Sequence, residues 1–288
     1  TRIWRNMPLG IIAPILGIKY LPEQKELSKR KFDVISAVAN AITFGLLIYT
    51  LDGFAHHERY DYLIIQSVIL IVVGTYYVRR QLGQESPLLP LDLLRIPIFR
   101  LSILTSICSF TAQMLAMISL PFFLQNTLGH SEVMTGLLLT PWPLATLFAA
   151  PAAGYLVERI HPGILGSIGM GIFCIGLYSL SMLDAESSIV SICLRLALCG
   201  VGFGLFQTPN NSTMIASAPK QRSGGASGMM GMARLMGQTF GTTLVALLFS
   251  WVAGSENTEV CLITGSMFAL IAAVVSSLRI SQPSALKE

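Results

Sequence analysis

Nine apolar runs separated by short polar segments dominate this sequence and limit what it can fold into. The runs cover residues 6–18, 34–51, 62–78, 101–124, 134–157, 164–183, 189–216, 225–252 and 260–278. A transmembrane helix needs about 17 to 25 mostly apolar residues, so every run except the first is long enough to cross a bilayer. None shows the alternation of apolar and polar residues that marks the strands of a membrane barrel. The pattern therefore predicts an all-α polytopic membrane protein.

The composition supports a membrane location. Of the 288 residues, 53% are hydrophobic and 12% are charged, whereas a soluble domain carries about 25% charged residues. The net charge of +4 is a signal of topology rather than of nucleic-acid binding, because its location matters more than its sum. The five cysteines lie in apolar runs without a C-x-x-C pair, which indicates packing rather than disulfides or a metal site.

The sequence does not predict an enzyme. It contains no nucleophile–base pair, metal-ligand cluster or ATP-binding loop. The glycines at 200, 202 and 204 follow no strand and lie inside an apolar run, which argues against a nucleotide loop. We therefore expect no cofactor and no metal, and any transport by this chain would have to be driven by an ion gradient such as that of protons.

The distribution of basic residues predicts the orientation. Alternate loops hold almost all the Lys and Arg residues outside the runs, among them Lys29, Arg80, Arg159, Arg222 and Arg279. The other loops are rich in acids. By the positive-inside rule the basic loops and the C-terminus are cytoplasmic, which predicts a multi-pass protein of a bacterial inner membrane. Counting nine segments back from that C-terminus puts Thr1 outside, so we expect several helices to precede this chain.

The run that follows Ser188 has the features of a helix lining a transport path. Arg195 lies about two turns inside it, where a guanidinium is costly unless it faces a partner or a wet cavity. Gly200 and Gly204 allow a neighbouring helix to approach closely. Its exit is polar and holds the cavity candidates Gln207, Asn210 and Asn211. Two interpretations of Arg195 remain open: a coupling residue, or a structural charge bonded to backbone carbonyls or another helix.

The run at 225–252 carries the second charge within an apolar run, Arg234, for which a structural link to another helix is the favoured interpretation. Around it stand two small-xxx-small pairs, Gly224 with Gly228 and Gly237 with Gly241. Such pairs pack helices together, and packing and gating can be one role here.

Prolines predict a kink in the run at 134–157. Pro141, Pro143 and Pro151 free backbone carbonyls that neighbours or water must satisfy. Trp142, between the first two prolines, is a cavity candidate that would contact a lipophilic cation through its ring face; ordinary packing is the alternative. Gln113 is a further cavity candidate.

Several motifs, taken in order, resemble the fourteen-span drug:proton antiporter family of the major facilitator superfamily. The segment Gly154–Gly163, with Glu158 and Arg159, resembles the superfamily's cytoplasmic loop motif G-x-L-a-D-r-x-G. Leu194-Arg195 with the glycines at 200, 202 and 204 resembles the motif on the fourth helix of each half. Arg222 to Gly228, then Ala233 to Gly241, resemble the thirteenth helix. The likeness covers nearly the whole chain and is closest to uncharacterised enterobacterial members.

The resemblance implies a major facilitator fold present as its C-terminal portion. It divides the chain into the tail of helix six with a linker (1–32), two inserted helices (33–80), an amphipathic cytoplasmic linker (81–100), a six-helix bundle (101–280) and a cytoplasmic tail (281–288). The N-terminal half of the same transporter is then absent. The motif carries Glu158 where Asp is commoner.

By resemblance the protein exports small lipophilic or cationic compounds across the lipid bilayer in exchange for protons. Arg195, Arg234, Glu158 and Arg159 are the implied coupling candidates. None of the fifteen acids falls in the middle of a run, so we expect the proton-carrying acid outside this chain. The alternatives are a channel-like or non-transporting membrane subunit, a carrier for a different small solute, and an intramembrane enzyme, for which no catalytic dyad is present.

Overall fold

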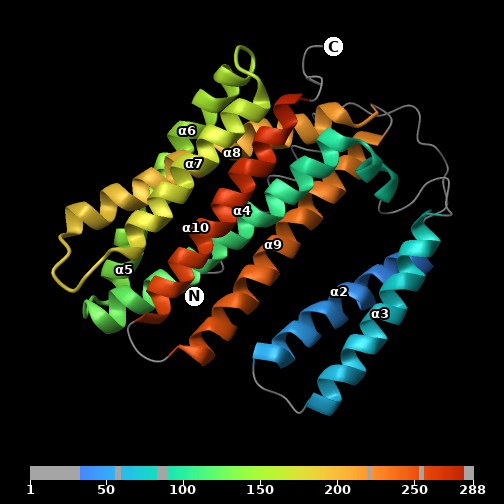
Figure 1. The fold of residues 1–288 in the computed structure, drawn as a ribbon, viewed down its shortest axis with the longest axis horizontal. Coiled ribbons are helices and arrows are strands. Elements are labelled where there is room, and N and C mark those ends of the chain that lie inside the picture. Colours follow the sequence, from blue (N-terminus) through green and yellow to red (C-terminus); the bar gives the residue numbers. More distant parts are fainter. Residues whose placement is uncertain (1–32, 56–59, 83–89, 220–221, 253–255, 282–288) are drawn as a thin grey trace, which may run out of the picture. The chain divides into compact units, whose positions relative to one another are not determined.

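The computed structural model describes residues 33–55, 60–82, 90–219, 222–252 and 256–281, and these residues are almost entirely helical (Figure 1). The predicted short run at 6–18 and its linker to residue 32 lie outside the described residues. The two inserted helices of the prediction are α2 (Val34–Ala55) and α3 (Tyr60–Leu82). The described chain is all-α, as the apolar runs predict.

A bundle of longer helices follows. In chain order its elements are η2 (Leu91–Arg95), α4 (Pro97–Phe122), the π-helical turn η3 (Phe123–Thr127), α5 (Glu132–Leu139), α6 (Pro141–Val157), α7 (Pro162–Ser181), α8 (Ile189–Ser217), α9 (Ser223–Trp251), α10 (Glu256–Ser277) and η5 (Leu278–Ser281). The helix bounds differ from the predicted runs by a few residues. The larger difference is the run at 134–157, which is divided into α5 and α6.

Local signals in the sequence explain where these helices begin. Pro97 and Pro162 occupy the first turns of α4 and α7, where a missing N–H costs nothing. Ser131 and Ser188 cap α5 and α8, because each side-chain oxygen accepts a 3.3 Å hydrogen bond from a backbone N–H three residues later.

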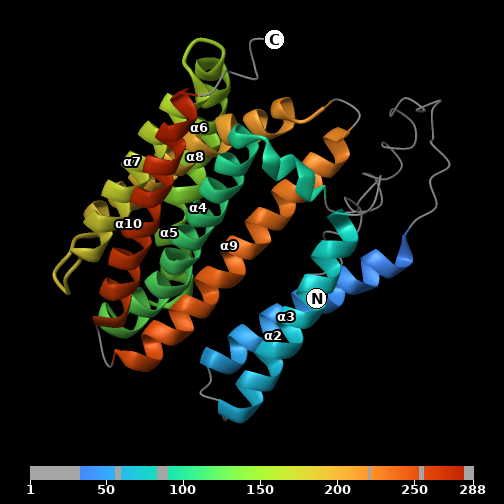
Figure 2. The same cartoon turned by 45° about the vertical axis from the view of Figure 1, so that its right-hand side comes forward.

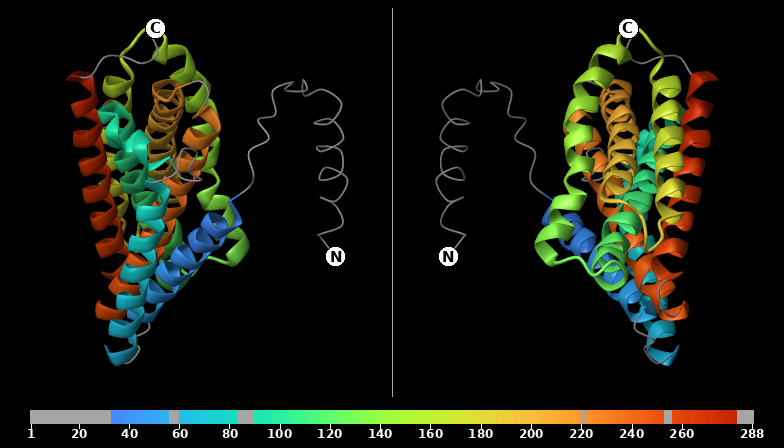
Figure 3. Two further views of the ribbon diagram at one scale, coloured as in Figure 1. Left: turned by 90° about the vertical axis from the view of Figure 1, so that its right-hand side faces the viewer. Right: turned by 90° about the vertical axis from the view of Figure 1, so that its left-hand side faces the viewer.

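The helices of the bundle run alongside one another (Figures 2 and 3). Helix α8 packs against α6 on one side and α7 on the other, α10 packs against both α7 and α4, and α4 also packs against α9. The core between them holds Phe173, Leu177 and Leu196, each fully buried. These contacts place the helices next to one another in the order α6, α8, α7, α10, α4 and α9.

The outer surface of the bundle is apolar, as a lipid-facing surface must be. Phe148 is 75% exposed and Leu194 is 66% exposed. Six described segments, in α3, α4 with η3, α5 with α6, α7, α8 and α10 with η5, are long and apolar enough to cross a membrane. Helix α9 is not among them because its glycines, Arg234 and Gln238 dilute its apolar content.

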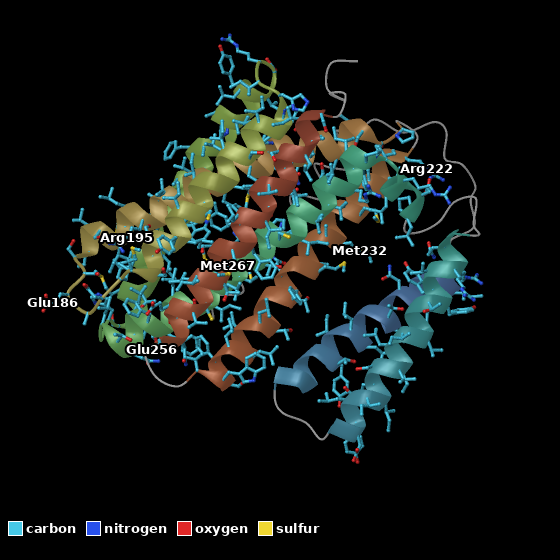
Figure 4. All side chains as sticks on the ribbon, viewed as in Figure 1. Glu186, Arg195, Arg222, Met232, Glu256 and Met267 are labelled. Carbon is cyan, nitrogen blue, oxygen red and sulfur yellow. The ribbon has the colours of Figure 1, made fainter. Side chains whose placement is uncertain are left out.

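The two ends of the bundle differ in charge. At one end, here called the basic end, α4, α7 and α9 begin and α6, α8 and α10 end, and it carries Arg100, Arg159 and Arg222. Arg222 forms an ion pair there with Asp92 of η2. Glu186 and Glu256 lie at the opposite end (Figure 4). The described bundle thus keeps the charge asymmetry from which the sequence predicts orientation.

Candidate functional site

A cavity of about 830 Å³ lies between α4, α5, α6, α8 and α9. Fifteen residues line it: Phe110, Gln113, Met117, Gly136, Leu139, Thr140, Trp142, Pro143, Thr146, Leu147, Ala150, Pro151, Phe203, Gln207 and Arg234. Most of these are apolar. A concave, mainly apolar surface with a few polar groups is the usual form of a small-molecule site.

Close contact between α9 and α4 forms one wall of the cavity. A Cβ atom at Gly237 would lie 2.5 Å from the Ile107 carbonyl oxygen, and one at Gly241 would lie 2.8 Å from the Thr111 carbonyl oxygen. The Thr111 hydroxyl donates to the Gly237 carbonyl at 3.1 Å, so the two backbones are also joined by a hydrogen bond. Only glycine permits this approach.

Alternating glycines let α8 approach a helix on each side. Gly200 and Gly204 face α6, where a Cβ atom would collide with the Trp142 carbonyl oxygen and with the Ala149 side chain respectively. Gly202 faces α7, and a Cβ atom there would lie 2.5 Å from the Phe173 amide nitrogen. The Thr146 hydroxyl donates to the Gly200 carbonyl at 3.0 Å and joins α6 to α8. At Gly200, Gly202 and Gly204, helix α8 lies too close to its neighbours to leave room for a side chain.

The predicted proline kink lies at Thr140, between α5 and α6. Helix α5 ends at Leu139 and α6 begins at Pro141, so the helix is interrupted at Thr140, which lines the cavity. The Thr140 carbonyl accepts a 3.2 Å hydrogen bond from the Leu144 amide, and its hydroxyl donates to the Gly136 carbonyl at 2.9 Å. The Leu137 carbonyl, with which Pro141 cannot pair because proline has no N–H, accepts a 3.2 Å hydrogen bond from the Thr140 amide.

Arg234 is the charged residue of the cavity lining. Its guanidinium carbon lies 5.5 Å from the centroid of the Phe110 ring, within the range of a cation–π contact. Gln113 and Gln207 add neutral carboxamides from α4 and α8. The remaining lining residues are apolar, threonine or glycine.

Comparison with known proteins identifies the fold family. The family model described as the Major Facilitator Superfamily matches residues 3–242 and, in a second match, residues 102–287. The chain belongs to the Major Facilitator Superfamily. The helical bundle with its membrane-length segments fits this fold, so the predicted fold class is confirmed.

Relatives of this major facilitator chain are named as transporters or as multidrug resistance proteins. It is 56% identical over 279 residues to "Uncharacterized transporter YebQ" of Escherichia coli (strain K12), covering 96% of the chain and 61% of that relative. It is 27% identical to "Multidrug resistance protein Stp" of Mycobacterium tuberculosis, covering 87% and 47%. It is 26% identical to "Riboflavin transporter RibZ" of Clostridioides difficile, covering 85% and 53%. The chain thus spans roughly half to three fifths of these relatives.

Of the five predicted cavity residues, three line the cavity of this facilitator bundle and two do not. Gln113, Trp142 and Gln207 line the cavity, and Arg234 lies with them. Trp142 is only 2% exposed, and its ring packs edge-on against Phe173 with centroids 5.4 Å apart. Its ring face is therefore part of the core, which agrees with the packing interpretation rather than with contact to a cation.

Asn210 and Asn211 differ from the expectation, because neither lines the cavity. Asn210 is 1% exposed, and its side-chain amide donates to the Ser106 hydroxyl at 2.8 Å. It lies three residues beyond Gln207 on α8, but its hydrogen-bond partners are Ser102 and Ser106 of α4 and Arg279 of η5. Its role in the described structure is to join helices.

The residue that the sequence analysis misplaced is Arg279. It was assigned to a basic loop, yet it is fully buried in η5. Its Nη1 donates to the Ser102 hydroxyl at 3.0 Å and to Asn210 Oδ1 at 2.7 Å, and its Nη2 donates to the Ser276 hydroxyl. The one available signal was its position directly after an apolar run, which by itself predicts a helix end and not burial.

Arg195 lies away from the cavity, in the first turns of α8 (Figure 4). Its Nη1 donates to the carbonyl oxygen of Ser179 near the end of α7. Of the two open interpretations, this contact supports a structural charge bonded to a backbone carbonyl. Glu158 and Arg159 are exposed at the basic end, where the Arg159 guanidinium lies 4.4 Å from the centroid of the Tyr155 ring. These three coupling candidates are thus separate from the cavity, whereas Arg234 lines it.

The two glycine pairs of α9 also differ from each other. Gly237 and Gly241 pack against α4, but a Cβ atom at Gly224 or Gly228 would meet nothing within 4 Å among the described residues. The expectation of close packing is therefore wrong for Gly224 and Gly228 within the described bundle. The tail and linker segments at 1–32 and 282–288 lie outside the described residues.

Proposed function

We propose that this chain is the C-terminal part of a fourteen-span transporter that exports lipophilic compounds in exchange for protons. The cavity carries the proposal. It is large enough for a drug-sized molecule, its lining is mainly apolar, and Gln113, Gln207 and Arg234 supply the polar contacts. Sites of this form bind a ligand through apolar contact area, and a few polar groups fix the orientation of the ligand.

The names of the relatives support a transported small molecule but not one particular solute. Stp is named as a multidrug resistance protein, which favours export of several compounds. RibZ is named as a riboflavin transporter, which favours a carrier for a single solute as the second candidate. The mostly apolar lining favours the first, because apolar contact discriminates poorly between ligands of similar size.

The packing of the bundle supports transport by movement of a rigid half. The glycine contacts that join α8 to α6 and α7, and α9 to α4, leave little freedom between these helices. Secondary transporters of this kind work by rocking one bundle against another around a central site. We propose that helices preceding this chain form the other bundle and close the cavity.

We further propose a bacterial inner membrane location with the basic end and the C-terminus in the cytoplasm. The basic loops beside α4, α6 and α9 support this orientation. None of the fifteen lining residues is acidic. Since arginine stays protonated at any working pH, the group that carries the proton is proposed to belong to the preceding helices.

The test is transport in proteoliposomes by the protein that contains this chain and its preceding helices. With an imposed pH gradient, we expect uphill movement of a lipophilic dye and a matching proton flux, both lost when nigericin collapses the gradient. Downhill movement that ignores the gradient would indicate a channel-like subunit instead. This chain reconstituted alone should insert without coupling dye movement to protons, and coupled movement by it alone would contradict the assignment of the acid to the preceding helices.

A further inference from the structure

The charge of the cavity lining indicates which ligands it favours. Among the lining residues, all of which lie in the described part of the chain, Arg234 carries a positive charge and no residue carries a negative one. The lining therefore has one formal positive charge. The Arg234 side chain is exposed, so a ligand that enters the cavity can reach its charge.

The position of Arg234 is set by the contact between α9 and α4. Arg234 stands one turn before Gly237, and the absence of a side chain at Gly237 brings α9 against Ile107 and Phe110 of α4. Its guanidinium then lies over the Phe110 ring. A ring face holds a cation in place but does not neutralise it. No ion pair joins Arg234 to an acid among the described residues.

The aromatic residues of the lining are not free to receive a cation. Phe110, Trp142 and Phe203 are exposed by only 7%, 2% and 3% respectively. The Phe110 ring lies under the Arg234 guanidinium, and the Trp142 ring packs edge-on against Phe173. The Phe203 ring packs edge-on against both Phe110 and Phe173. Recognition of a lipophilic cation usually requires an exposed aromatic face or a carboxylate, and this wall offers neither.

From these observations we infer that the cavity selects lipophilic organic anions and that Arg234 determines this selectivity. The inference rests on the proposed function and narrows its substrate class. The apolar lining binds the body of such a ligand, while Arg234 pairs with its negative charge. The amides of Gln113 and Gln207 are two further donors on the same lining. A cation of the same shape meets the same apolar surface but is repelled by Arg234.

The test compares two ions that match in shape and differ in the sign of their charge. Tetraphenylborate and tetraphenylphosphonium are offered to this chain in lipid nanodiscs, and binding to empty nanodiscs is subtracted to remove partition into lipid. We expect the chain to bind tetraphenylborate at least about tenfold more tightly than tetraphenylphosphonium. The Arg234→Gln variant should lose about tenfold of this preference, whereas Arg234→Lys should retain most of it.

A matched control is Arg100→Gln. Arg100 is exposed at the start of α4 and outside the cavity lining, so this variant changes the net charge equally and should keep the preference. Elution of each variant as a single species in detergent confirms that it is folded. Tighter binding of tetraphenylphosphonium, or an unchanged preference in Arg234→Gln, would overturn the inference while leaving the proposed function intact. Saturable binding of neither ion would count against both.

Discussion

The guanidinium of Arg279 donates a hydrogen bond of 2.7 Å to the side-chain oxygen of Asn210, although 69 residues separate them in the sequence. Both side chains are buried, and both also contact Ser102 of α4. Ser276, which accepts from Arg279, in turn donates to the Gly163 carbonyl at the start of α7 at 3.2 Å. One buried charge at the basic end therefore connects α4, α7, α8 and α10. Its partners in the described chain are neutral, so each hydrogen bond to it matters more than an ordinary one.

The first prediction concerns this network. Asn210→Ala removes an acceptor from a buried guanidinium, and a hydrogen bond to a charged group contributes about 1.5–3 kcal/mol. We expect the variant to lower the midpoint of thermal unfolding in detergent, followed by tryptophan fluorescence. Asn211→Ala is the matched control, because Asn211 is half-buried and makes no hydrogen bond in the described structure. Equal midpoints for the two variants would contradict the role given to Asn210.

The second prediction separates the two glycine pairs of α9. Gly237→Ala places a methyl group 2.5 Å from the Ile107 carbonyl oxygen, and overpacking of this kind costs about 1–3 kcal/mol. Gly228→Ala meets open space and gains helix propensity of up to about 1 kcal/mol. Thermal unfolding of this chain in detergent should therefore shift in opposite directions for the two variants. A similar loss at both positions would show that Gly228 is packed as closely as Gly237.

The third prediction concerns topology. Single cysteines are introduced at Arg159 and Arg222 of the basic end and at Glu186 and Glu256 of the other, in a background without the five native cysteines. A maleimide that cannot cross the membrane should label the last two in intact cells and the first two only after lysis. The reason is that cytoplasmic loops carry an excess of Lys and Arg. Labelling of Arg159→Cys in intact cells would reverse the proposed orientation.

Much of the fold follows from local features of the sequence. The predicted run at 189–216 differs by one residue from α8, which ends at Ser217, because Ser188 caps the helix and a long apolar stretch follows it. The proline kink was also predictable, since Pro141 cannot extend the helix that precedes it. The candidate site was predictable only in part. Gln113, Trp142 and Gln207 were named from the sequence as cavity residues and line the cavity, whereas Asn210 was named with them and lies elsewhere. Arg234 also lines it, although the sequence indicated a coupling or structural role.

By itself the sequence determined that this protein is a helical membrane protein, where most of its helices begin to within a few residues, and which of its loops are basic. These properties depend on residues within a few turns of each other. Only the tertiary structure decided which side of each helix faces the cavity. It distinguished Gly237 from Gly228, Gln207 from Asn210, and a buried Arg279 from an exposed loop residue. The physical reason is that burial depends on which helix lies alongside, and the contacts of Arg279 with Ser102 and Asn210 join residues 177 and 69 positions apart.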